Sequence, residues 1–217
     1  HIEPPQVLFN KLEDELVEEL RERYSGSQAE RADKAQAALD GAEKVSAPVD
    51  TRPLCQRFAA KVALKVGRIT AIERHPKADK LYVETVDMGD SSRTIVSGLV
   101  PHYSEEELLG KHIVVVSNLK SAKLRGVESF GMLLAASQPK EGGGETVEVL
   151  FLDGVEAGTP LTLEGVDTPF EGEMIDIDSF FSMPIVVKDF QVQIDGKALL
   201  ANSTALKTTV VASGEVG

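Results

Sequence analysis

The stretch KVGRITAIERHPKADKLYVETVDMGDSSRTIVSGLV, residues 65–100, decides the fold class. It consists of short runs rich in β-branched residues, divided by turn segments such as HPKAD and MGDSS. Runs of this kind are typical of strands in a small antiparallel sheet. The same pattern of short apolar and β-branched runs continues downstream as KHIVVVSNL, FGMLLAAS, TVEVLFL and TPLTL. The pattern predicts a mainly β protein built around a small barrel.

One short helix is expected between these strands. Ser104 is followed by three glutamates and then by Leu108 and Leu109, and Ser with Glu three residues later is typical of a capping box. A five-stranded barrel interrupted by a helix fits the oligonucleotide-binding (OB) fold. We therefore predict an OB-fold barrel.

The flanks of the barrel differ from it in composition. LEDELVEELRERY, residues 12–24, has apolar residues at helical spacing, an alanine-rich second helix follows, and VSAPVDTRP is typical of a linker. Downstream, PIVVKDFQVQIDGKALL predicts a strand pair around a turn at residues 194–197, and the segment is too apolar for a disordered tail. The expected parts are a helical segment with a linker (1–50), the OB barrel (51–165) and a small β-rich C-terminal domain packed on the barrel (166–217).

Composition excludes several classes of protein. The chain has 217 residues, of which 42% are hydrophobic, so it can bury a substantial core. No apolar run approaches the roughly 20 residues that cross a bilayer, so we expect a soluble cytoplasmic protein with no membrane partner. Cys55 is the only cysteine and the four histidines are scattered, so we expect no disulfide, metal or cofactor.

The net charge of −12 argues at first sight against a nucleic-acid partner. The acids, however, lie mostly outside the barrel: residues 51–165 hold 15 acids and 14 bases, whereas residues 166–217 hold 8 and 3. Residues 111–125 contain four bases and no acid. A nearly neutral barrel can therefore present a basic face.

The stretch quoted first, with NLKSAKLRGVESFGMLLAAS at residues 118–137, closely resembles the tRNA-binding domain of the endothelial monocyte-activating polypeptide II family. The resemblance covers roughly residues 60–165 and implies an OB fold that binds tRNA. Residues 166–217 occupy the place of the family's small C-terminal domain.

A second resemblance lies at the start of the chain. VLFNKLEDELVEELRERYSG resembles the segment that closes the anticodon-binding helical domain of methionyl-tRNA synthetases. It implies that the barrel extends a synthetase whose catalytic and anticodon-binding domains lie upstream. The catalytic signatures of that class are absent from these 217 residues, so no aminoacylation is expected of them.

The candidate site combines cations with small polar residues. Lys120, Lys123 and Arg125 beside Gly126 can follow a phosphate backbone, and Asn118 can read a base edge or a ribose, or hold a turn. Met132 fits core and contact equally, and His75 is a turn residue or a ligand contact. The expected tRNA-binding residues are Lys65, Arg68, Lys77, Lys80, Ser97, Asn118, Lys120, Lys123, Arg125, Ser129 and Met132. Ser97 with His102 or His112 lacks a third orienting residue, so no catalytic site is expected.

Three functions remain open at this point. The first is a sequence-tolerant tRNA binder that raises the tRNA affinity of a tethered synthetase. The second is a protein-interaction module for dimerisation or assembly with other synthetases, supported by the acidic C-terminal part. The third, a general single-strand binder, needs aromatic stacking platforms. The barrel offers few aromatics for that purpose: Phe58, Tyr82, Tyr103, Phe130 and Phe151.

Overall fold

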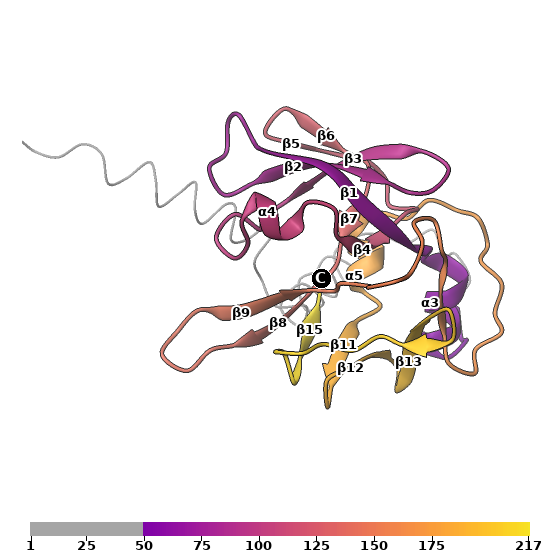
Figure 1. Ribbon diagram of the computed structural model, residues 1–217. Coiled ribbons are helices and arrows are strands. Elements are labelled where there is room, and N and C mark those ends of the chain that lie inside the picture. Colours follow the sequence, from indigo (N-terminus) through magenta and orange to yellow (C-terminus); the bar gives the residue numbers. More distant parts are fainter. Residues whose placement is uncertain (1–49) are drawn as a thin grey trace, which may run out of the picture. The chain divides into compact units, whose positions relative to one another are not determined.

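The computed structural model describes residues 50–217 (Figure 1). These residues fall within one compact unit of the chain, residues 44–217. The two predicted helices over residues 12–24 and 27–45, and the first half of the predicted linker, lie outside the described residues.

Five antiparallel strands form the barrel sheet, in the order β3-β2-β1-β4-β7. β1 pairs with β2 through its second half and with β4 through its first half, and a bulge between Ile69 and Ala71 allows it to bend from one to the other. The strands are β1 (Leu64–Arg74), β2 (Tyr82–Asp87), β3 (Ser92–Ser97), β4 (His112–Val116) and β7 (Met132–Leu133).

Helix α4 (Glu105–Leu108) lies between β3 and β4, as an OB barrel requires. The carboxylate of Glu107 accepts hydrogen bonds from the backbone N–H and the hydroxyl of Ser104, at 2.8 and 2.9 Å, which confirms the predicted capping box. Apolar side chains such as Ile69, Val86 and Ile113 fill the barrel. The predicted fold class is therefore confirmed.

A second sheet joins the end of the barrel to the C-terminal part, in the order β10-β13-β12-β11-β15-β8-β9 with β14 beside β13. The predicted turn is present: Ile194 pairs with Lys197, and Asp195 and Gly196 have φ angles of 53° and 73°. The strands are β8 (Ala135–Pro139), β9 (Glu145–Val149), β10 (Leu161–Leu163), β11 (Ile185–Lys188), β12 (Gln191–Ile194), β13 (Lys197–Ala201), β14 (Thr204–Ala205) and β15 (Ser213–Val216).

One strand, β15, holds this sheet together, because it pairs with β11 on one side and with β8 on the other. The approach to β8 is close at Gly214. A Cβ atom there would lie 2.0 Å from the carbonyl oxygen of Ser137, so only glycine fits.

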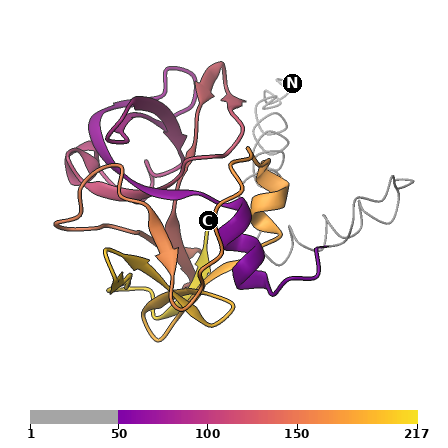
Figure 2. The ribbon, with the colours of Figure 1, turned by 90° about the vertical axis from the view of Figure 1, so that its right-hand side faces the viewer.

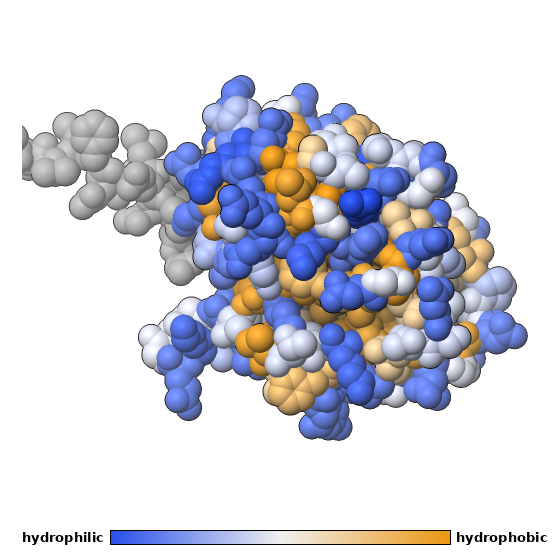
Figure 3. Space-filling view, in the orientation of Figure 1, coloured by the Kyte–Doolittle hydropathy of each residue, from blue (hydrophilic) through white to orange (hydrophobic). Residues whose placement is uncertain are grey.

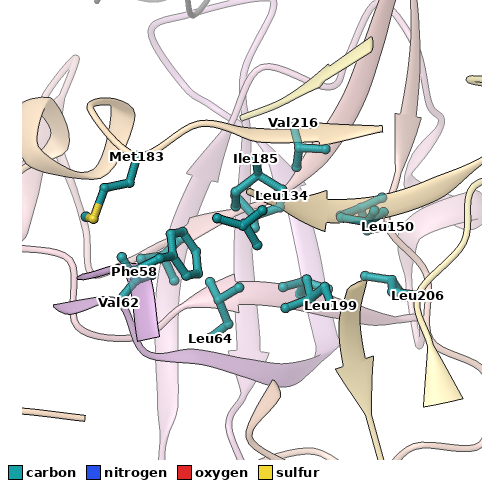
Figure 4. Packing of buried hydrophobic residues seen from close by; sticks show 14 of the residues in the cluster. Phe58, Val62, Leu64, Leu134, Leu150, Met183, Ile185, Leu199, Leu206 and Val216 are labelled. Atoms are coloured by element: carbon teal, nitrogen blue, oxygen red, sulfur yellow. The ribbon is translucent and has the colours of Figure 1, made fainter. Parts of the chain in front are cut away.

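The barrel and the C-terminal strands share one hydrophobic core (Figure 4). Phe58 and Leu64 come from the start of the described chain, Leu134 precedes β8, and Leu199 and Val216 come from the C-terminal strands. Helices α3 (Leu54–Lys61) and α5 (Ile177–Phe181) add to this core. Figure 2 shows the yellow C-terminal strands beneath the barrel with α3 along their side. Residues 166–217 therefore bury their apolar side chains against the barrel.

Two local expectations need correction. The sequence predicts a loop over residues 118–126, but part of this segment folds into a small hairpin made of β5 (Ala122–Leu124) and β6 (Val127–Ser129). Helix α3 follows the predicted linker and was not expected. None of the helices in residues 50–217 is long and apolar enough to span a membrane.

Candidate nucleic-acid interface

Three of the seven predicted cations lie on hairpin β5–β6 or just before it. Lys123 pairs across the hairpin with Glu128, and Arg125 and Gly126 form the turn with φ angles of 49° and 96°. Gly126 suits this left-handed turn because it has no Cβ atom. Lys120, Lys123 and Arg125 are all exposed. The hairpin therefore presents cations along one strand and at its tip.

His75 anchors this hairpin to the β1–β2 turn. Nδ1 of His75 accepts the backbone N–H of Lys77 at 3.0 Å, so the ring proton is on Nε2, which donates to the carbonyl oxygen of Leu124 at 3.1 Å. The side chain is buried. Of its two expected roles, His75 takes that of a packed turn residue, and it brings Lys77 beside Gly126 at the hairpin tip.

The base of the hairpin is fixed to β3. The hydroxyl of Ser129 accepts the N–H of Val96 and donates to the carbonyl of Gly131, both at 3.0 Å. The N–H of Phe130 donates to the carbonyl of Thr94 at 2.8 Å. Ser129 is therefore a buried support for the hairpin, and its expected contact with tRNA stays a prediction that these internal hydrogen bonds do not favour.

Asn118 has a structural role as well. Its Oδ1 accepts the N–H of Ala63 at 2.9 Å, and its Nδ2 donates to the carbonyls of Lys61 and Glu173, both at 2.7 Å. Only 6% of the residue is exposed. Because both amide hydrogens are used within the protein, Asn118 cannot read a base without breaking these bonds. The alternative that it holds a turn is the one that the structure favours.

Ser97 is also withdrawn from solvent, because its hydroxyl donates to Oε1 of Glu84 inside the barrel. Burial raises the pKa of Glu84 to about 8, and the hydrogen bond from Ser97 opposes this rise. Oε2 of Glu84 has no hydrogen-bond partner among the described residues. The Ser97 hydroxyl thus binds Glu84, and the expected contact of Ser97 with tRNA stays a prediction that this hydrogen bond does not favour.

The predicted cations fall into two groups. Among residues 50–217, no carboxylate forms an ion pair with Lys77, Lys80, Lys120, Lys123 or Arg125. The hairpin and the neighbouring turn thus form a basic edge, which we define by these five residues. Hairpin β5–β6 is at the top of Figure 1, where the space-filling view shows hydrophilic residues beside a small apolar patch (Figure 3).

The remaining three predicted residues lie apart from the basic edge. The Lys65 ammonium is 3.9 Å from a carboxylate oxygen of Asp90, which partly neutralises it. Arg68 is exposed on β1, two strands away from β3. Met132 is partly buried against the core. The structure therefore gives Met132 the packing role.

Two residues near the hairpin base were missed. Nη1 of Arg93 donates to the carbonyl oxygens of Ser117 and, at 3.5 Å, of Phe130. Phe130 is 44% exposed, although its ring is large and apolar. Arg93 stands in the strand run RTIVSGLV, which was interpreted only as a strand. Phe130 was noted as one of few aromatics, and nothing in the sequence separates it from those in the core.

A small antiparallel OB barrel with an exposed basic edge defines a class of nucleic-acid-binding modules. Comparison with known proteins narrows this class. The family described as "Putative tRNA binding domain" matches residues 64–160. The C-terminal domain of Plasmodium vivax p43 has a crystal structure that aligns with a TM-score of 0.65 and 31% identity, over 74% of this chain and 98% of that domain. The chain belongs to this family of tRNA-binding domains.

Curated relatives match all or most of the chain. A methionine–tRNA ligase of Treponema denticola is 39% identical over 100% of this chain, and one of Borreliella burgdorferi is 37% identical over 82% of it. The chain spans 30% and 21% of the lengths of these two enzymes. The resemblance to a tRNA-binding domain appended to methionyl-tRNA synthetases is thus confirmed.

Proposed function

We propose that the barrel binds tRNA through the basic edge, as the extension of a methionine–tRNA ligase in the cytoplasm. The observation that carries the proposal is the set of five exposed cations, without ion pairs in the described chain, on the β1–β2 turn and on or beside a hairpin that His75 and Ser129 hold in place. In a chain of net charge −12, most other cations of residues 52–80 are neutralised: Arg52, Lys61, Lys65 and Arg74 all have carboxylate partners.

The arrangement of charges on the basic edge favours recognition of the shape of tRNA rather than its base sequence. Contacts to phosphates position a protein but carry no sequence information, and base edges must be read by polar side chains. Asn118, Ser97 and Ser129 are hydrogen-bonded within the protein, so the basic edge is left with charges alone. We therefore expect little preference among tRNAs.

Tethering explains how a weak site of this kind would help an enzyme. A second site joined by a linker makes part of the encounter intramolecular, so the apparent affinity rises without new specificity. The domain would hold tRNA near the catalytic part of the ligase. Contacts with other synthetases, or with a second copy of the chain, belong to the alternative function.

The test is a double charge reversal on the hairpin. Lys123→Glu with Arg125→Glu removes two attractions and adds two repulsions, so tRNA affinity should fall by at least about 10-fold and the slope of log affinity against log salt should decrease by about 1.5. The fold should survive, since both residues are exposed. Filter binding at several salt concentrations measures affinity and slope.

The matched control is Lys188→Glu with Lys207→Glu, which changes the net charge equally at two exposed residues of the C-terminal part. It should alter binding by less than about 3-fold, because a distant charge is screened. If the control lowers affinity as much as the hairpin variant does, the basic edge is not the site. Light scattering on the same samples would show whether the chain self-associates.

A further inference from the structure

A hollow of about 520 Å³ lies at the base of hairpin β5–β6. β3 contributes Ser92, Arg93 and Thr94, the two residues that flank the hairpin contribute Ser121 and Phe130, and Met174 comes from the stretch before α5. None of these six residues belongs to the basic edge. The hollow is therefore a feature that phosphate binding alone leaves unused.

One side of the hollow is apolar and held in place. Phe130 is 44% and Met174 is 54% exposed, so two large apolar side chains line an open hollow. Hydrogen bonds to Thr94 and from Arg93 fix the backbone of Phe130 on both sides of its Cα atom. An aromatic ring presented in this way offers a flat face at little cost in conformational entropy.

The other side is polar and retains hydrogen-bonding capacity. The hydroxyls of Ser92 and Thr94 have no partner among the described residues, and Arg93 uses only Nη1 for the carbonyls it binds. Its other N–H donors are therefore available to a ligand. Hydroxyls and guanidinium N–H groups beside an aromatic ring match the edge and the face of a nucleobase.

Carboxylates near the hollow discriminate against a phosphate inside it. Ser121 donates to Glu128 at 2.7 Å, and Ser91, also at the rim, donates to Asp90 at 2.9 Å. Arg93 is the one cation that lines the hollow among the described residues, and two cations of the basic edge flank it: Lys120 precedes Ser121, and Lys123 follows two residues later. A base in the hollow would thus leave its phosphates at the basic edge.

We infer that this hollow takes one unstacked nucleotide of the bound RNA, with the base against Phe130. The inference rests on the proposed function and names the part of the tRNA that the site requires. Bases inside a helix are stacked and cannot enter, so the nucleotide comes from a single-stranded end or from a loop. Stacking on an aromatic ring is tolerant of base identity, which agrees with a binder that reads shape.

Fluorescence tests the inference directly, because the chain contains no tryptophan. In the full chain with Phe130→Trp, tRNA should quench the single indole, and an RNA duplex of equal length should not. The matched control is Phe190→Trp, at a phenylalanine that is 42% exposed in the C-terminal part, and its fluorescence should not respond. A tRNA trimmed of its single-stranded 3′ end separates the two sources: lost quenching assigns the base to that end, and retained quenching assigns it to a loop.

Affinity gives the second measurement. Phe130→Ala should weaken tRNA binding by about 5- to 100-fold with an unchanged salt slope, because a stacking contact and no phosphate contact is lost. Phe190→Ala should leave affinity within about 2-fold. Two results would overturn the inference and leave the proposed function intact. The first is equal quenching of Phe130→Trp by duplex and tRNA. The second is an unchanged affinity of Phe130→Ala for tRNA while the hairpin charge reversal abolishes binding. If the hairpin reversal also had no effect, the proposed function itself would fail.

Discussion

At the scale of single residues, Glu84 is the side chain whose environment has the clearest consequence. Its carboxyl group is fully buried and its pKa is raised to about 8, against 4.5 for an exposed glutamate. The folded protein therefore holds this proton more tightly than the unfolded chain. Stability from this group is complete below pH 4.5 and is lost as the pH rises towards and through 8.

We predict that Glu84→Gln removes this pH dependence. At pH 9 the free energy of unfolding of the variant should exceed that of the parent by on the order of a few kcal/mol, because the parent then buries an unpaired charge, and the variant should unfold at a higher temperature. Circular dichroism melts at pH 5, 7 and 9 provide the measurement. Parallel profiles for parent and variant would show that Glu84 does not control this range.

Single residues also show how far sequence reasoning reaches. Lys77, Lys123 and Arg125 were predicted on the surface because an unpaired ammonium or guanidinium must stay hydrated. Asn118 and Ser129 are short and polar, and such side chains suit a ligand or a buried backbone equally well. Their partners, Lys61, Glu173 and Val96, are distant in sequence, so only the folded chain separates the two roles.

At the scale of elements, hairpin β5–β6 depends on one histidine from another element. We predict that His75→Ala weakens tRNA binding several-fold without removing a cation, because the carbonyl of Leu124 loses its donor and the basic edge loses its fixed position. Hydrogen exchange at residues 122–129 should become faster. His102→Ala, at an exposed histidine, is the control and should change neither quantity. An unchanged hydrogen-exchange rate in the His75 variant would mean that the hairpin is stable without the contact from His75.

The long strands and α4 could be predicted from sequence, whereas this hairpin and α3 could not. β2 places a buried residue at every second position, and β1 is long and rich in β-branched residues, so both have the features of strands. β5 and β6 have three residues each, which is too short to show a periodic pattern of hydrophobic residues. Contacts with β3 and His75 stabilise these two strands, and such tertiary contacts cannot be seen in the sequence. α3 has only eight residues and begins directly after Pro53, so the sequence of this helix was interpreted as the end of the linker.

At the scale of the whole molecule, the shared core predicts that the barrel and the C-terminal strands unfold together. Leu199→Ala on β13 should lower the free energy of unfolding by about 2–5 kcal/mol, because Leu199 is 1% exposed within that core. Leu109→Ala, at a leucine that is 50% exposed, should change it by less than about 0.5 kcal/mol. Urea unfolding should give one transition in both variants. Two separate transitions would contradict a common core.

The position of β15 between β8 and β11 also determines how quickly the protein reaches its native state. Glu215 pairs with Ser137, roughly eighty residues away along the chain, and closing so long a loop costs entropy before the new contacts repay it. Strand β15 should therefore dock late, on a timescale of about milliseconds to seconds. Until it docks, the edge of β8 is open to strands of other chains. Refolding yield should accordingly fall as protein concentration rises, even where the finished fold is stable.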